Sequence, residues 1–255
     1  MRGVPWRMIV TVPRTVLSVG VAACLLAGAP LTPSAAAVTR AGAQTLAAGV
    51  AADFHMNEEA GSTVMTDSGG NGNHGVIDPT GVVTGYVVGG ATGYHWVRRP
   101  PEQYPASPER VIQVADDIDL EPGDQPFTIE IRYRTKEKFG NITQKGQATT
   151  RGGQWKIQNP QGIPSCLFKG SRGQVATGAK TPLNDNRWHT LTCVLTSSSV
   201  TMYVDGVFRN RKNGATGTID NSIPMTVGGK INCDQLETTC DYFSGQIDYI
   251  RITKG

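Results

Sequence analysis

The sequence lacks any segment in which apolar residues recur at helical spacing. An internal repeat of the solenoid or propeller type is missing as well. In their place stand many short apolar runs, separated by turns that draw on the 31 glycines and 15 prolines of the chain. Such a pattern excludes a helical protein and predicts an all-β sandwich.

An excess of basic charge is missing too. The chain has 24 basic and 21 acidic side chains, but the first 37 residues contain three arginines and no acidic residue. The remainder therefore carries no formal net charge. This balance does not fit the broad positive surface of a nucleic-acid-binding protein, so we expect no nucleic-acid partner.

Long apolar runs are absent except near the start, where Thr15 to Ala29 carry no charge. Three arginines precede or flank this run, and Ala35, Ala36 and Ala37 follow it. This arrangement predicts a secretory signal peptide over residues 1–37, cleaved before Val38. We expect a secreted, extracellular protein with no membrane span after cleavage. An alternative is a lipid anchor at Cys24, since Val21–Cys24 resembles a lipobox.

Cysteine is scarce, and the sequence contains no C-x-x-C pair or Cys/His cluster of the kind that binds zinc. Four cysteines follow the signal segment, an even number that suits an oxidising compartment. They allow three pairings. We favour Cys233–Cys240, which closes a short loop, and Cys166–Cys193, which would join neighbouring strands.

Alternating apolar residues are clearest between residues 188 and 208. Leu191, Cys193 and Leu195 share one face of a strand, and the pattern resumes after a serine turn. Asp205-Gly206 then predicts a tight hairpin turn. Comparable strands are expected at 127–134 and 245–252. Residues 38–50 are predicted to be a linker, and residues 51–255 a single all-β domain.

Five segments in this order resemble the laminin-G-like, concanavalin A-like lectin/glucanase domains of secreted bacterial proteins. They are DSGGNGNHG (67–75), FTIEIRYRT (127–135), ITQKG (142–146), RWHTLTCV with VTMYVDG (187–194 and 200–206), and FSGQIDYIRI (243–252). The resemblance implies two antiparallel sheets in a jelly roll. It also implies that a concave sheet or the rim loops hold glycans.

The same superfamily includes glycoside hydrolases and polysaccharide lyases, so catalysis has to be tested on the residues. A retaining glucanase needs two carboxylates about 5–5.5 Å apart. The sequence contains no E-x-D-x-x-E pattern, and Asp116, Asp117 and Asp119 are interpreted as solvated loop residues. We therefore expect a binding module rather than an enzyme.

The resemblance also suggests a structural calcium ion. Asp67, Asn71 and Asn73 offer oxygen ligands within a glycine-rich loop, and Asp248 on the last strand would complete the set. Asp53 is a weaker candidate. The alternative is a turn held by its own Asp and Asn side chains.

A ligand-binding face is predicted from Glu130, Arg132 and Arg134 on one side of a strand, together with Lys156. The planar guanidinium groups suit carboxylates and sulfates, so an acidic sugar is one possible ligand. Trp96, with Tyr94 and Tyr104, is the expected exposed aromatic, whereas Trp155 and Trp188 are assigned to the core and His189 to a structural role. The alternative is a solvated face on which Glu130 pairs with a basic neighbour.

The sequence thus predicts a secreted, non-catalytic module that binds a polysaccharide or a cell-surface glycan. Two alternatives remain: a glycan-active enzyme of the same fold, and an adhesion module that binds an extracellular protein.

Overall fold

The computed structural model describes residues 49–98, 110–233 and 241–255, which belong to one compact unit. The predicted signal peptide, Cys24, Tyr104 and Cys240 lie outside these residues, as does nearly all of the predicted linker. No helix among the described residues has the length and apolar character needed to cross a membrane.

The unit is built almost entirely from strands, as the alternating sequence pattern predicts. The strands are β1 (Gly49–Phe54), β2 (Val64–Met65), β3 (Gly75–Ile77), β4 (Val82–Val88), β5 (Ala91–Trp96), β6 (Ile112–Val114), β7 (Phe127–Arg134), β8 (Asn141–Lys145), β9 (Gln154–Gln158), β10 (Ser165–Gly170), β11 (Gly173–Gly178), β12 (His189–Thr196), β13 (Ser199–Val204), β14 (Val207–Asn213), β15 (Met225–Val227) and β16 (Gly245–Lys254). Two short 3-10 turns, η2 (Ile118–Leu120) and η3 (Pro160–Gly162), interrupt them.

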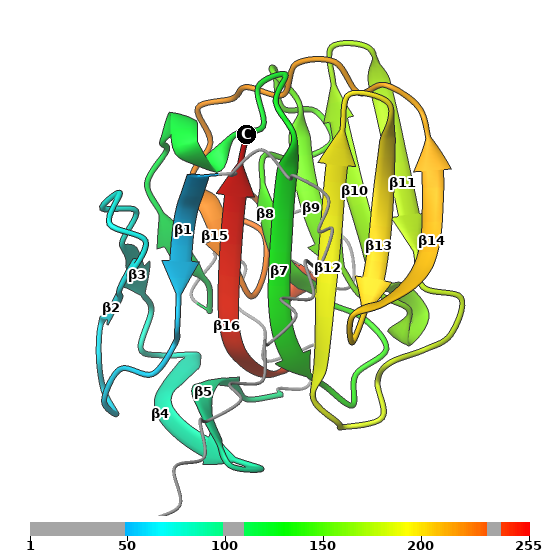
Figure 1. Ribbon diagram of the computed structural model, residues 1–255. Helices are drawn as coiled ribbons and strands as arrows, with labels where there is room; N and C mark the ends of the chain where they lie inside the picture. Colours follow the sequence, from blue (N-terminus) through cyan, green and yellow to red (C-terminus); the bar gives the residue numbers. More distant parts are fainter. Residues whose placement is uncertain (1–48, 99–109, 234–240) are drawn as a thin grey trace, which may run out of the picture. The chain divides into compact units, whose positions relative to one another are not determined.

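The strands form two antiparallel sheets of eight strands each, stacked face to face (Figure 1). Sheet A has the order β14-β13-β12-β7-β16-β5-β4, with β1 paired to β16. Sheet B has the order β11-β10-β9-β8-β15-β6-β3-β2. This is the jelly-roll sandwich expected from the sequence.

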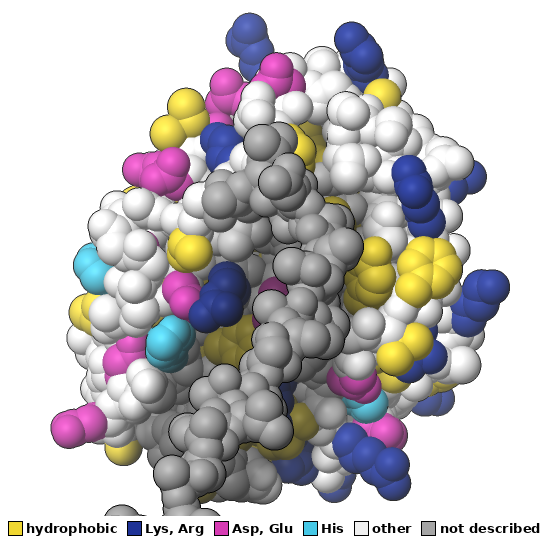
Figure 2. Space-filling view, viewed as in Figure 1, with side chains coloured by type: hydrophobic (Ala, Val, Ile, Leu, Met, Phe, Trp, Pro, Cys, Tyr) yellow, Lys and Arg dark blue, Asp and Glu magenta, His cyan; other side chains and the backbone are white. Residues whose placement is uncertain are grey.

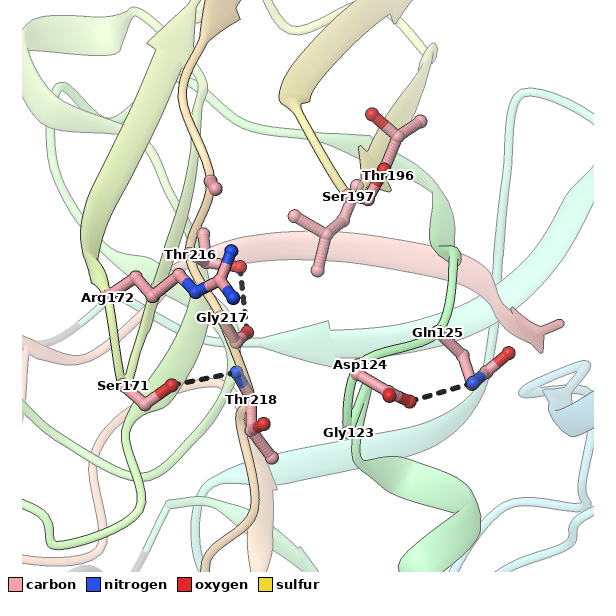
Figure 3. A pocket seen from close by; sticks show the side chains of 12 residues that line it. Gly123, Asp124, Gln125, Ser171, Arg172, Thr196, Ser197, Thr216, Gly217 and Thr218 are labelled. Carbon is pink, nitrogen blue, oxygen red and sulfur yellow. Dashed lines mark hydrogen bonds between the residues drawn. The ribbon is translucent and has the colours of Figure 1, made fainter.

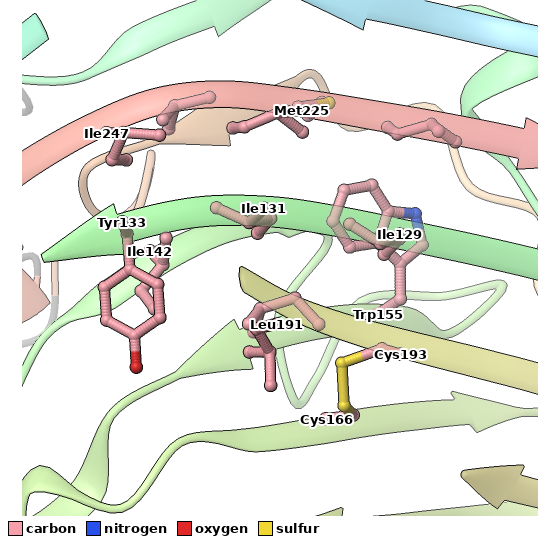
Figure 4. Close-up of a cluster of buried hydrophobic side chains, with 14 of the residues drawn as sticks. Ile129, Ile131, Tyr133, Ile142, Trp155, Cys166, Leu191, Cys193, Met225 and Ile247 are labelled. Atoms are coloured by element: carbon pink, nitrogen blue, oxygen red, sulfur yellow. A yellow bond between two sulfur atoms is a disulfide. The ribbon is translucent and has the colours of Figure 1, made fainter. Parts of the chain in front are cut away.

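The core fills the space between the sheets. In β7 the side chains alternate strictly between buried and half-buried positions, with Phe127, Ile129, Ile131 and Tyr133 turned inward. Trp155 of sheet B packs against Phe127, with 6.1 Å between their ring centroids. Figure 4 shows Ile129 and Ile131 meeting Trp155 between the two layers. Period-two patterning therefore sets which face of each strand is buried.

A disulfide joins Cys166 of β10 to Cys193 of β12, as predicted (Figure 4). The two strands are not neighbours, however: β10 belongs to sheet B and β12 to sheet A. The bond crosses the core and fastens one sheet to the other. The predicted pairing of Cys233 with Cys240 involves a residue outside the described part of the chain.

One strand departs from the sequence interpretation. Residues 91–96 form β5, although we expected Tyr94 and Trp96 to be exposed aromatics. Tyr94 and Trp96 are fully buried because β5 pairs with both β4 and β16.

Candidate functional site

Polar side chains form a straight row across the side of sheet A that points away from sheet B, here called the outer face of sheet A. The strand register sets Asp53 of β1 opposite Arg251 of β16, and Arg251 opposite Glu130 of β7. Glu130 in turn lies opposite Thr192 of β12, and Thr192 opposite Tyr203 of β13. Because side chains alternate along each strand, one register brings groups from five strands onto one surface.

Hydrogen bonds and ion pairs fix these side chains in position. Arg251 donates to Asp53 Oδ2 from Nε at 3.1 Å and from Nη2 at 2.7 Å. Glu130 accepts at both oxygens, from the Tyr249 hydroxyl at 2.8 Å and from the Thr192 hydroxyl at 3.2 Å. The carboxylates and their donors are thus held by neighbouring strands, which lowers the entropy cost of ordering them for a ligand.

An open hollow of about 380 Å³ lies over this part of the face. Its six lining residues are all polar: Asp53, His55, Glu130, Asp248, Tyr249 and Arg251. Partial burial raises the pKa of the Tyr249 hydroxyl to about 12, and the hydrogen bond to Glu130 adds to the effect. Tyr249 therefore remains a neutral donor at physiological pH. The hollow offers carboxylate acceptors beside hydroxyl and guanidinium donors.

Trp188 provides the aromatic component of the face. The Arg132 guanidinium lies 5.0 Å from the ring centroid of Trp188, and that of Arg134 lies 5.8 Å away. The Nε1 of Trp188 donates to the Val88 carbonyl at 3.3 Å, and the Trp188 side chain is only half-buried. We had assigned Trp188 to the core; the structure corrects this and places it on the outer face, beside the predicted arginines.

The two arginines are themselves anchored. Arg132 donates to Asp248, and Arg134 donates from Nη2 to Asn186 Oδ1 at 2.8 Å. The structure thus groups three of the predicted ligand residues, Glu130, Arg132 and Arg134, on one strand face.

Two other predicted ligand residues do not join them. Trp96 is fully buried, and its Nε1 donates to the Arg110 carbonyl at 3.1 Å, so it is not an exposed aromatic. Lys156 lies on β9 in sheet B, opposite Gln144 of β8. Sheet membership, which short-range patterning does not reveal, separates Lys156 from the β7 side chains.

The glycine-rich loop at 67–75 is fastened to β1 by hydrogen bonds. Asp67 Oδ1 accepts from the backbone N–H groups of Asp53 (2.9 Å) and Gly69 (2.8 Å), and Oδ2 accepts from that of Asn73 (3.0 Å). Asn71 and Asn73 each donate from Nδ2 to the Ala51 carbonyl at 3.0 Å. These contacts are those of a turn held by its own side chains.

The residues proposed for calcium do not fit a common ligand set. Asp67 already accepts three backbone N–H groups, whereas Asp248 is paired with Arg132 on the outer face. Within the described ranges, no three His, Cys, Asp or Glu side chains are grouped as metal ligands. Calcium binding stays a prediction, with no support from this arrangement.

A second hollow, of about 270 Å³, lies at one end of the sandwich where turns of both sheets meet. Figure 3 shows Arg172 on one side of it and Asp124 with Gln125 on the other. Gln125 Nε2 donates to Asp124 Oδ1 at 2.7 Å, and Ser171 Oγ accepts from the Thr218 N–H at 3.1 Å. This hollow is polar but has no aromatic wall, so we rank it below the outer face of sheet A.

Sequence reasoning missed a buried charge cluster. Lys145 is fully buried at the end of β8, and its Nζ donates to Asp116 Oδ1 (2.5 Å), Glu121 Oε1 (2.6 Å) and the Asn221 carbonyl (2.5 Å). Asp116 is thus an ion-pair partner, not simply the solvated residue we expected. The cluster fastens two loops to sheet B.

Comparison with known structures places the fold. Domain 4 of AbnA, a GH43 extracellular arabinanase from Geobacillus stearothermophilus solved with arabinotriose, is 14% identical with a TM-score of 0.57, covering 82% of this chain and 93% of that domain. The binding domain of Paraclostridial Mosquitocidal Protein 1 is 16% identical with a TM-score of 0.53, covering 81% and 48%. The binding domain of botulinum neurotoxin DC, in complex with SialylT, is 12% identical with a TM-score of 0.53, covering 81% and 46%.

The chain spans about half the length of each toxin domain, and these low identities establish a shared fold alone. No curated protein sequence matches the chain. Residues 109–255, which hold most of both sheets, match a family model. Together with the jelly-roll topology, this match makes the chain a member of the concanavalin A-like lectin/glucanases superfamily.

Proposed function

We propose that the protein is a secreted carbohydrate-binding module and that the outer face of sheet A is its binding face. The observation that carries the proposal is the half-buried Trp188 ring, which contacts Arg132, the ion-pair partner of Asp248 in the polar hollow. A sugar presents C–H groups on its ring faces and hydroxyl groups around its edge. An aromatic ring beside fixed donors and acceptors complements both.

The electrostatics of the face favour binding over bond cleavage. Asp53 is paired with Arg251 and Asp248 with Arg132, while Glu130 accepts hydrogen bonds at both oxygens. Glycosidase chemistry needs one carboxyl group protonated near neutral pH and another kept free as base or nucleophile. Carboxylates engaged in this way suit the positioning of sugar hydroxyl groups.

The partner is accordingly a polysaccharide or a cell-surface glycan. A glycan array probed with the protein, with and without Ca²⁺, tests this directly. We expect binding to at least one class of glycan, and about a five- to thirtyfold loss of affinity in Trp188→Ala, because stacking energy of about 1–2 kcal/mol disappears.

Two further variants make the test specific. Glu130→Gln keeps the shape of the side chain but removes its charge, and we expect it to weaken binding without loss of fold. Phe139→Ala removes an aromatic side chain that is 39% exposed and lies in the loop between β7 and β8, and it should bind like the wild type. An array without a single positive glycan, with an extracellular protein captured instead, would favour the adhesion alternative.

A further inference from the structure

The edge strand β14 carries a concentration of exposed positive charge. It forms one edge of sheet A, and six of its seven residues are exposed. Arg209, Arg211 and Lys212 stand close together on it, and the segment from Gly206 to Ile219 contains no acidic residue. Figure 2 shows Lys and Arg side chains down the side of the molecule where Figure 1 places β14.

The cationic strip extends beyond this strand. The edge strand of sheet B, β11, packs beside β14, and Asn210 Nδ2 donates to the Gly178 carbonyl at 3.2 Å. Arg172 lies in the turn before β11 and Lys180 follows its end; both are exposed. A seven-residue strand is roughly 23 Å long. The five cations, here called the basic flank, therefore follow one side of the sandwich from end to end.

These charges are free, unlike those of the binding face. Arg132 and Arg251 each pair with a carboxylate. By contrast, no ion pair or hydrogen bond engages the guanidinium or ammonium group of a basic-flank residue within the described part of the chain. In Figure 3, Arg172 lies at the second hollow, and the hydrogen bonds drawn there join other residues. An unpaired cation costs less to engage because no existing partner has to be given up.

An aromatic pair lies where the basic flank meets the outer face of sheet A. Phe208 is 57% exposed and packs edge-on against Tyr203, with 6.1 Å between ring centroids. Tyr203 ends the row of polar side chains that starts at Asp53. The proposed binding face and the basic flank are therefore continuous through these two rings.

We propose that the basic flank binds an acidic polysaccharide, a linear glycan that carries a carboxylate or sulfate on successive sugars. Unpaired guanidinium and ammonium groups along one side of the sandwich match such a chain, because each can pair with an anionic group while Phe208 contacts a sugar ring. The inference rests on the proposed function only in taking the ligand to be a glycan. It adds the chemical class and a second location.

Cations on an edge strand also prevent unwanted strand pairing. That role needs charge within the edge strands β14 and β11 and does not explain Arg172 or Lys180, which lie beyond the ends of β11. It also predicts no affinity for a polyanion beyond a general charge effect. The chain as a whole has nearly balanced charge, so a general effect is small.

The test compares immobilised polygalacturonate, dextran sulfate, neutral dextran and duplex DNA as probes for the full chain. We expect binding to one or both acidic polysaccharides and none to dextran, with affinity that falls as salt rises. Replacing Arg209, Arg211 and Lys212 together by Glu should reduce that affinity by about tenfold or more and flatten its salt dependence.

The matched control replaces Lys136, Lys138 and Arg151 by Glu, which makes the same change of net charge at exposed positions outside the basic flank. It should retain most of the affinity. Equal losses in both triple variants, tighter binding to DNA than to either polysaccharide, or no binding to acidic polysaccharide would each overturn the inference. None of these outcomes bears on glycans whose binding depends on Trp188. A failure of the basic-flank proposal is therefore distinguishable from a failure of the proposed function.

Discussion

At the scale of single residues, side-chain alternation predicts whether Trp188 is buried or exposed better than the identity of its neighbours in the sequence does. Trp188 has the same parity as Thr190 and Thr192, which point outward from β12, and extending that pattern by two residues predicts its position on the outer face. Trp96 is one of the inward-facing residues of β5, a strand that the sequence pattern did not indicate because prolines follow it closely. The buried Lys145 had no signal in the sequence, because its partners Asp116 and Glu121 reach it only through tertiary folding.

His95 provides a prediction about pH. It stacks on Tyr86, with ring centroids 4.5 Å apart, and its burial lowers the pKa of the imidazole below the ordinary value of 6.5. The folded protein therefore binds this proton less readily than the unfolded chain does. As pH falls from about 6.5 through the lower folded pKa, the free energy of unfolding should decrease.

The measurement is urea unfolding of the wild type and of His95→Phe between pH 7.5 and 5. The variant should lose part of the pH dependence, because the remaining aromatic ring packs without titrating. Tyr86→Phe, which keeps the ring stacked on His95 and leaves the imidazole in place, serves as the control. Identical pH profiles for the wild type and His95→Phe would contradict the assignment.

At the scale of elements, local patterns were sufficient for β7, β12, β13 and β16, whose alternation is long and regular. They were insufficient for assigning strands to sheets. Cys166 and Cys193 were paired correctly, yet they connect sheets rather than neighbouring strands, and Lys156 lies on the layer opposite Glu130. Such relations depend on contacts between residues far apart in the chain, which periodicity does not record.

The loop at 67–75 gives a prediction at this scale. Removing the carboxylate in Asp67→Ala leaves three backbone N–H groups without their acceptor, two of them buried. We expect the free energy of unfolding to fall by about 2–4 kcal/mol. Thermal unfolding of Asp67→Ala and of the wild type measures this loss. The same measurement on the wild type with and without a chelator tests for a bound calcium ion, and the Tm should not change if hydrogen bonds alone hold the loop.

Asp124→Ala is the control, since Asp124 is exposed and its carboxylate accepts a hydrogen bond only from the side chain of its neighbour Gln125 among the described residues. A fall of the wild-type Tm in chelator, restored by added Ca²⁺, would instead support the calcium ion that the sequence suggested. In that case the loop would have to release some of its present contacts to bind the ion.

At the scale of the whole molecule, the sequence predicted the sandwich because strands such as β7 and β12 alternate regularly and short strands recur between turns. It also pointed to the side chains of β7 in the proposed binding face. What it did not predict is the arrangement of strands around that face, in which β1 and β16, separated by most of the chain, supply Asp53 and Arg251 side by side. The basic flank is likewise a product of topology, since β11 and β14 meet only where the two sheets end.

Export is the prediction that concerns the entire chain. When the full sequence is expressed in a bacterial host, the exported product should begin at Val38, and N-terminal sequencing measures this. Cys24→Ser should leave both export and the new N-terminus unchanged. Incorporation of labelled fatty acid that depends on Cys24 would favour the lipid-anchored alternative.

The pairing of β1 with β16 has one more consequence. Gly49 lies opposite Lys254, so the polypeptide enters and leaves the sandwich at a single corner. A fold with adjacent entry and exit points can be spliced into a surface loop of an unrelated host protein, or reopened at another turn after its ends are joined, without disturbing either layer. The serine turn at 197–198 is a suitable place for such a new opening.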